Sequence, residues 1–114
     1  MSRDCVLCNI SNGDIPTEVL YRDEQTLAIR DINPQAPVHL LVFPVNHFTS
    51  LSQTTQSFER SMGHLLAIAE MMATRESIAE QGYRLVINHG NNAGQQIPHL
   101  HLHVLGGTML GPMG

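Results

Sequence analysis

The chain has 114 residues, six of them Lys or Arg and ten Asp or Glu, which gives a formal charge of −4 at pH 7. This length predicts one domain, residues 1–114, with a single modest core. A protein that binds nucleic acid must neutralise the phosphate backbone with cations, and this chain has few, so we expect no nucleic-acid partner. The sequence has no apolar run near the roughly 20 residues that span a bilayer and no signal-peptide core, so we expect no membrane contact and a cytoplasmic protein.

The first half of the chain predicts a short helix, a hairpin and a central strand. Residues 4–12 favour a helix stopped by the glycine and proline of NGDIP. Residues 19–21 and 26–30 flank a polar turn and predict two antiparallel strands. The prolines of DINPQAP exclude that stretch from a sheet, and the apolar run HLLVFP, residues 39–44, predicts a central strand.

The second half predicts one long amphipathic helix and two more strands. One helical face collects the apolar residues at 58, 62, 65, 66, 69, 72 and 73, with Ser57 as the cap and Gly82 as the end of the helix. Residues 83–88 and 99–105 predict the last two strands. The order of elements indicates an α+β fold, a five-stranded antiparallel sheet with a short N-terminal helix and one long helix that covers one side.

Three histidines at alternate positions, His99, His101 and His103, lie in the last predicted strand. Because successive side chains of a strand point to opposite faces, the three rings share one face, and the intervening Leu and Val side chains face the helix. Rings on one face stand about 6.6 to 6.8 Å apart, close enough to surround one phosphate. A neutral imidazole can attack phosphorus, and the loop 90–96 can turn backbone N–H groups toward the same phosphate. The plainer alternative is a partly exposed polar face without function.

The two cysteines, Cys5 and Cys8, form a CxxC pair near the start of the chain. Two thiolates are half of a tetrahedral zinc site. Two free thiols and a redox pair are the alternatives. A thioredoxin-like motif is disfavoured because the pair neither follows a predicted strand nor lies in a βαβ pattern.

The segment HLHLHVL, residues 99–105, resembles the signature of the histidine triad superfamily, and the following Gly106-Gly107 is similar to its Hint branch. The likeness extends over CVLCNISNGDIP, LAIRDINPQAPVHLLVFPVNH and GYRLVINHGNNAGQQIPHLHLHVLGG. It implies a hydrolase that cleaves nucleoside 5′-phosphoramidates, such as adenosine 5′-monophosphoramidate, and acyl nucleotidates through a nucleotidyl-histidine. It also implies a homodimer in which two sheets join into one ten-stranded sheet.

The same resemblance implies roles for individual residues. His101 would be the nucleophile and His103 would bind the α-phosphate, with His99 and His39 completing the cluster. The implied substrate-binding residues are Asp31 at the ribose, Ile32 at the adenine, and Asn88, Gly94, Gln95 and Gln96 at the phosphate, ribose or leaving group. Gln96 replaces a serine common in Hint proteins and cannot act as an acid, so the leaving-group preference stays open.

A structural zinc ion is also implied, since some bacterial histidine triad proteins resemble this chain in carrying an N-terminal CxxC. Here its ligands would be Cys5, Cys8, His47 and His99, and no cofactor would be required for catalysis. Two other functions stay open. One is hydrolysis of dinucleoside polyphosphates, as in the Fhit branch, against which Gly106-Gly107 argues. The other is a non-catalytic module that binds metal or a partner, because alternating histidines also bind zinc, copper or nickel.

Overall fold

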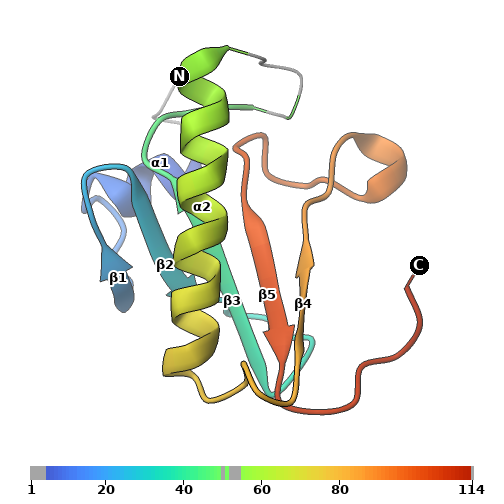
Figure 1. Cartoon of the computed structure of the whole chain (residues 1–114). Helices are drawn as coiled ribbons and strands as arrows, with labels where there is room; N and C mark the ends of the chain where they lie inside the picture. Colours follow the sequence, from blue (N-terminus) through green and yellow to red (C-terminus); the bar gives the residue numbers. More distant parts are fainter. Residues whose placement is uncertain (1–4, 50, 52–54, 114) are drawn as a thin grey trace.

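A computed structural model describes residues 5–49, 51 and 55–113 as one five-stranded antiparallel sheet with a helix on each face (Figure 1). The strand order is β1-β2-β3-β5-β4. In chain order the elements are α1 (Val6–Ser11), β1 (Val19–Arg22), β2 (Thr26–Arg30), β3 (Val38–Pro44), α2 (Gln56–Arg75), β4 (Tyr83–Val86), the 3₁₀ turn η2 (Asn91–Ala93) and β5 (Leu102–Gly106). This confirms the predicted α+β fold. Within the described residues, no helix combines the length and the apolar character that crossing a membrane requires.

Helix α2 lies across one face of the sheet (Figure 1). Its N-cap is Thr55, whose Oγ1 accepts a hydrogen bond from the Phe58 N–H at 3.1 Å, and not the predicted Ser57. Leu66 was expected on the packed face but is 48% exposed, because the buried stripe passes through the next turn at Ile68. The buried side chains of the helix are Phe58, Leu65, Ile68, Ala69, Met72 and Ala73.

The prediction that Gly82 ends the long helix is wrong, since α2 ends at Arg75. Ser77 adopts the left-handed conformation with φ +63°. The N–H groups of Ser77 and Ile78 then bond to carbonyls of the last helical turn at 3.1 and 3.0 Å, which is the paired pattern of a Schellman cap. Ile78 is 4% exposed and belongs to the core under the sheet, so its burial holds the turn in place.

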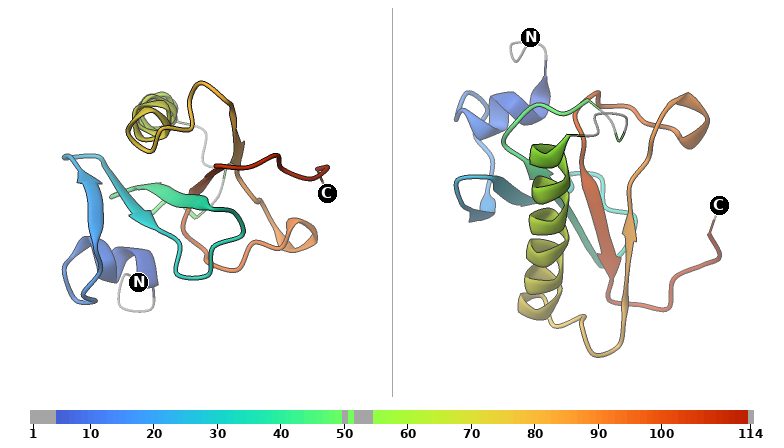
Figure 2. Two further views of the ribbon diagram at one scale, coloured as in Figure 1. Left: turned by 90° about the horizontal axis from the view of Figure 1, so that it is seen from below. Right: turned by 45° about the horizontal axis from the view of Figure 1, so that its top comes forward.

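Helix α1 covers the opposite face, over β2 and β3 (Figure 2). The sheet is therefore covered on both faces, where the sequence predicted one. The reason is that β2 and β3 are buried on both sides, as a continuous apolar run such as HLLVFP requires. The second core consists of Cys5, Leu7, Cys8, Ile10, Leu27, Ile29, Leu41 and Phe43.

The last two strands differ from the predicted ones at the end that carries the histidines. Strand β4 ends at Val86 and not at residue 88, and β5 begins at Leu102 and not at His99. Pro98 has no N–H for a ladder, and the Leu100 N–H bonds to the Phe48 carbonyl, which lies outside the sheet, at 2.6 Å. Residues 97–101 are consequently irregular.

The two glycines after the histidines have a packing explanation. A Cβ at Gly106 would lie 2.8 Å from Cδ1 of Ile78. Gly107 has φ +92°, and a Cβ there would lie 3.0 Å from Cβ of Pro37. Only glycine satisfies both close approach and this backbone conformation, so the pair fixes how β5 leaves the sheet.

The Schellman cap at Ser77 provides a test of the α2 terminus. We expect Ser77→Gly to raise the free energy of unfolding by about 0.5–1 kcal/mol, because glycine adopts φ > 0 without the steric cost that serine bears. The same replacement inside the helix, Ser61→Gly, should lower it by about 0.5 kcal/mol. Urea unfolding of both variants checks this. A loss of stability in Ser77→Gly would show that the left-handed conformation costs serine nothing here.

Candidate active site and metal centre

Two histidines from neighbouring strands and a third from the segment just before β5 form one cluster on the face of the sheet opposite α2. His39 lies in β3 and His103 in β5, where His103 pairs directly with Leu41, so His39 is its diagonal neighbour. The ring centroids of His39 and His103 are 5.1 Å apart, as are those of His101 and His103. We call His39, His101 and His103 the histidine cluster. Asp31, directly after β2, adjoins it because its N–H bonds to the His39 carbonyl at 3.0 Å.

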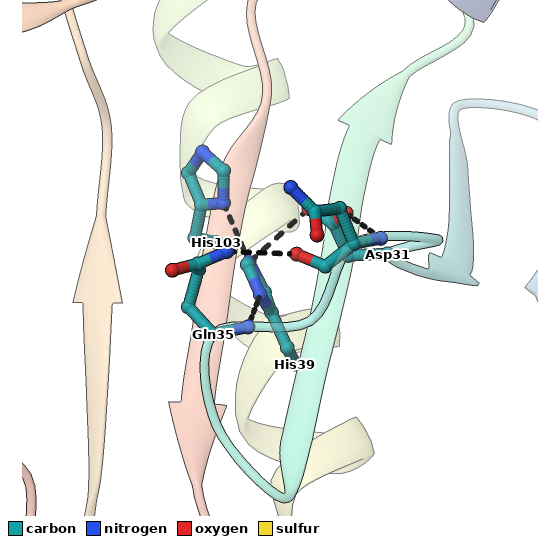
Figure 3. Close-up of polar contacts among 5 residues, drawn as sticks. Asp31, Gln35, His39 and His103 are labelled. Atoms are coloured by element: carbon teal, nitrogen blue, oxygen red, sulfur yellow. Dashed lines mark hydrogen bonds and ion pairs between the residues drawn. The ribbon is translucent and has the colours of Figure 1, made fainter.

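Hydrogen bonds decide which nitrogen of His39 and His103 carries a proton (Figure 3). The backbone N–H of Gln35 donates to His39 Nδ1 at 3.0 Å, so the proton of the neutral His39 ring is on Nε2. His39 Nε2 lies 2.8 Å from His103 Nδ1 and 3.3 Å from Asp31 Oδ2. His39 therefore donates to His103 Nδ1, and the proton of the neutral His103 ring is on its other nitrogen, Nε2. His103 presents an N–H donor.

His101 has the opposite tautomer. Its Nδ1 lies 2.7 Å from the backbone carbonyl oxygen of His99, and a carbonyl only accepts, so Nδ1 carries the proton. Nε2 then has the free lone pair, and this atom has no hydrogen-bond partner among the residues that the structure describes. The ring is 8% exposed. A nucleophilic nitrogen and an N–H donor thus lie on adjacent rings, an arrangement that suits attack on phosphorus.

His99 does not join this cluster, although it was expected to share a phosphate with the other two. Its Nε2 donates to the carbonyl of Pro44 at 2.8 Å, which leaves the lone pair on Nδ1. Nδ1 lies 3.3 Å from Cys5 Sγ, 3.5 Å from Cys8 Sγ and 3.2 Å from His47 Nδ1. The structure therefore brings together all four residues of the metal site that the resemblance implied, with their ligand atoms within 4.8 Å of one another.

The spacing of these four atoms fits a tetrahedral metal ion. Bond lengths of about 2.3 Å to sulfur and about 2.05 Å to nitrogen put two nitrogens about 3.3 Å apart and a sulfur about 3.6 Å from a nitrogen. The observed values are 3.2 Å for the two nitrogens and 3.2 Å from Cys8 Sγ to His47 Nδ1. Burial raises the pKa of the Cys8 thiol to about 11, and its hydrogen bond with Cys5 acts in the same direction. A metal must displace that proton, so binding is coupled to proton release.

A second set of possible ligands, Asp31, His39 and His103, lies within the histidine cluster. Here His39 Nε2 and His103 Nδ1 are 2.8 Å apart, shorter than the separation of about 3.3 Å for two nitrogens on one tetrahedral ion. The distance is that of an N–H···N hydrogen bond. The geometry favours a hydrogen-bonded pair over a metal site.

Burial keeps the His39 and His103 rings neutral. It lowers the pKa of His103 to about 4, and positive charge on His101 and His39 acts in the same direction, while Asp31 opposes it. Burial also lowers the pKa of His39, again opposed by Asp31. Both rings are therefore neutral at pH 7, as the hydrogen-bond pattern requires.

The loop between β4 and β5 is closed by one side chain. Gln95 accepts from the Gly90 N–H at 2.9 Å through Oε1 and donates to the Thr49 and Ile97 carbonyls at 3.0 and 3.2 Å through Nε2. Both ends of its amide are bonded to backbone groups, so the side chain braces the loop against Thr49, and its predicted substrate contact stays a prediction. The neighbouring Gln96 is exposed and helps line a cavity of about 420 Å³ with Thr49, His89, Gly90, Asn91, Gln95 and Pro98.

The remaining predicted contacts are substrate contacts and stay predictions. Ile32 is 98% exposed, Asn88 is half-buried at the end of β4, and Gly94 closes η2 in the left-handed conformation with φ +79°. No sequence signal pointed to the Gln35 N–H or to the Pro44 carbonyl, because both act through backbone atoms. Any residue except proline provides an N–H, so only the structure identifies them.

Comparison with known proteins identifies the family. The HIT domain model matches residues 12–110, and the chain belongs to this family, as the histidine motif predicted. It is 37% identical over 113 residues to purine nucleoside phosphoramidase from Escherichia coli strain K12, covering 99% of this chain and 95% of that protein. A HIT family hydrolase from Clostridium thermocellum is 41% identical with a TM-score of 0.92 and 96% of each chain covered. A zinc-bound histidine triad family protein from Mycobacterium smegmatis is 31% identical with a TM-score of 0.82, covering 96% of this chain and 78% of that one.

The pKa of His103 makes stability depend on pH. The folded-state value of about 4 lies below the value of about 6.5 for an unfolded histidine, so the unfolded chain binds a proton that the folded chain excludes. The contribution of His103 to the free energy of unfolding is complete above about pH 6.5 and is lost as the pH falls through about 4. We expect His103→Asn to lose less unfolding free energy than the wild type between pH 7 and pH 4, as measured by urea unfolding. Equal losses in the two proteins would contradict the assigned pKa.

Proposed function

We propose that the protein is a purine nucleoside phosphoramidase, which hydrolyses the P–N bond of nucleoside 5′-phosphoramidates such as adenosine 5′-monophosphoramidate to AMP. One observation carries the proposal: adjacent rings have opposite tautomers, with a lone pair on Nε2 of His101 and an N–H on Nε2 of His103. The 37% identity to the Escherichia coli phosphoramidase supports the choice of substrate class.

The reaction proceeds in two displacements. Nε2 of His101 attacks phosphorus, the bond from phosphorus to the leaving nitrogen breaks, and that nitrogen takes up a proton from solvent water and departs as the amine. Water then attacks the nucleotidyl-histidine, the P–Nε2 bond breaks and AMP leaves. In both steps the Nε2–H of His103 donates to a phosphate oxygen, where negative charge accumulates.

The proposed substrate contacts are those that the family resemblance implies. Asp31 accepts from the ribose hydroxyls, and the exposed side chain of Ile32 gains burial against the adenine. Asn88 and the backbone at Gly94 contact the ribose or phosphate. Gln96 faces the leaving group from the cavity beside η2, where its amide donates a hydrogen bond but cannot donate a catalytic proton.

We further propose a homodimer in the cytoplasm. Strand β4 lies at the end of the strand order, with β5 as its partner among the described strands, so its other edge can pair with a second copy. Two such edges side by side would produce a ten-stranded sheet with one histidine cluster in each half.

We propose that the metal ion held by the two cysteines, His47 and His99 is zinc. Two thiolates and two imidazoles are ligands that suit zinc, and one related structure is described as zinc-bound. When bound, zinc supplies a structural link and takes no part in the displacements. The four residues connect α1 to the loop after β3 and to the segment before β5, so the ion would join three parts of the chain distant in sequence.

The nucleophile can be tested directly. We expect His101→Ala to lower kcat with adenosine 5′-monophosphoramidate by about 10³-fold or more, because the covalent route is lost. Wild-type protein quenched during turnover should carry a nucleotidyl group on His101 by mass spectrometry. His64→Gln, on α2 and away from the cluster, is the control and should keep wild-type turnover. An adduct on another histidine, or unchanged turnover in His101→Ala, would refute the assignment.

The metal site has its own test. We expect the purified protein to contain about one zinc ion per chain, and zinc at 100 times its dissociation constant to raise the Tm of the metal-free protein by about 10 °C. The variant Cys5→Ser/Cys8→Ser should bind no zinc and show no shift. Metal analysis and thermal unfolding monitored by circular dichroism measure both. An equal shift in wild type and variant would place the metal outside the cysteine pair.

A further inference from the structure

The carboxylate of Asp31 is held so that it faces the histidine cluster. Its Oδ1 accepts from the Asn33 N–H at 2.8 Å, and its own N–H bonds to the His39 carbonyl at 3.0 Å. The first bond orients the carboxylate and the second anchors the Asp31 backbone, and Oδ2 lies 3.3 Å from His39 Nε2 (Figure 3). A residue proposed to bind only ribose would not need this orientation.

His39 is held from both ends. Its side chain is 4% exposed, with Nδ1 on the Gln35 N–H and Nε2 between Asp31 and His103. A backbone N–H can only donate, so Nδ1 of a neutral His39 must be the acceptor and the ring has one tautomer only. Loop 31–37 makes this possible, since Pro34 and Pro37 restrict the backbone on each side of Gln35.

Without His39, the tautomer of His103 would not be determined. The His39 contact is the hydrogen bond that the structure gives to the His103 ring within the described residues. The two tautomers of a free imidazole are close in energy, and a His103 with its proton on Nδ1 would turn a lone pair, not an N–H, toward a phosphate oxygen.

We propose that Asp31 and His39 are positioning residues of the proposed phosphoramidase, which act through His103 to hold its Nε2–H toward the phosphate. The inference rests on the proposed function and gives Asp31 a second role beside the ribose. Asp31 fixes the Nε2 edge of His39, and His39 transmits the direction of the Gln35 N–H to His103. The charge of Asp31 also favours protonated over neutral imidazole in both rings, as its effect on the pKa of His103 and of His39 indicates.

Two variants of His39 test the relay. His39→Gln keeps an acceptor for the Gln35 N–H and an N–H donor for His103 Nδ1, whereas His39→Leu keeps neither. In the ligand-free protein at pH 7, imidazole ¹⁵N NMR should show His103 with one protonated nitrogen, Nε2, in the wild type and in His39→Gln. In His39→Leu the two nitrogens should show averaged shifts, and kcat should fall about tenfold, the cost of one hydrogen bond. An unchanged His103 spectrum in His39→Leu would overturn the proposal.

A change of ligand separates the two roles of Asp31. Asp31→Asn keeps an Oδ1 acceptor for the Asn33 N–H and removes the charge. Its loss of kcat/KM is measured with adenosine 5′-monophosphoramidate and with the 2′,3′-dideoxy analogue, which has no ribose hydroxyls. We expect about a threefold or larger loss to persist with the analogue, because a net hydrogen-bond contribution changes rates by this order. A loss that disappears with the analogue would mean that Asp31 acts on the ribose alone, and would overturn its positioning role.

The chain provides a matched control for the carboxylate. Asp23 faces His64 Nε2 at 2.7 Å on α2, and its Oδ1 accepts from backbone N–H groups as that of Asp31 does. Asp23→Asn should leave the His103 spectrum and turnover unchanged.

If His39→Leu does not fold, His39→Gln and Asp31→Asn still decide the matter, since a lost Nε2–H tautomer in His39→Gln would also overturn the relay. The spectra need no substrate, so they stand even if the wild type fails to form a nucleotidyl-His101, the result that would overturn the proposed function instead.

Discussion

Backbone groups that cannot change direction control the chemistry of this protein. An amide N–H only donates and a carbonyl only accepts, so each fixes the proton of the imidazole that it contacts. The Gln35 N–H does this for His39, the His99 carbonyl for His101 and the Pro44 carbonyl for His99. Three rings of the same chemical type thus suit three different proposed roles, those of a relay, a nucleophile and a metal ligand. Their differences come from the main chain, not from their own residue type.

His99 links the two sites in this structure. Its ring belongs to the cysteine cluster, and its carbonyl holds the ring of His101. A movement of the His99 backbone would therefore also shift the ring of His101 and its Nε2. A metal ion on Nδ1 would restrain the ring, and with it the backbone carbonyl of the same residue, which contacts His101 Nδ1. The metal centre and the histidine cluster are consequently separate in chemistry but joined in geometry.

The sequence predicted the fold well because its signals are local and repeated. Alternation and apolar runs located the five strands, and the spacing from Phe58 to residue 73 located α2. The helix end was missed because Ser77 adopts a conformation usually taken by glycine, and the burial of Ile78 that supports it is a tertiary contact. Likewise, the histidine motif predicted the site, and the family resemblance predicted that His47 lies beside the two cysteines. The separation of His99 from the cluster, and the use of Gln95 inside its own loop, depend on contacts that no spacing encodes.

One of these misplaced boundaries also explains the tautomer of the proposed nucleophile. If β5 began at His99, as the alternating pattern indicated, the carbonyl of His99 would lie within a strand flanked by β3 and β4 and would be available to their N–H groups. The strand begins at Leu102 instead, since Pro98 and the bond from Leu100 to Phe48 take the preceding residues out of the ladder. The His99 carbonyl is then free to accept from His101 Nδ1. The break in the sheet creates the acceptor that directs the lone pair of His101 to Nε2.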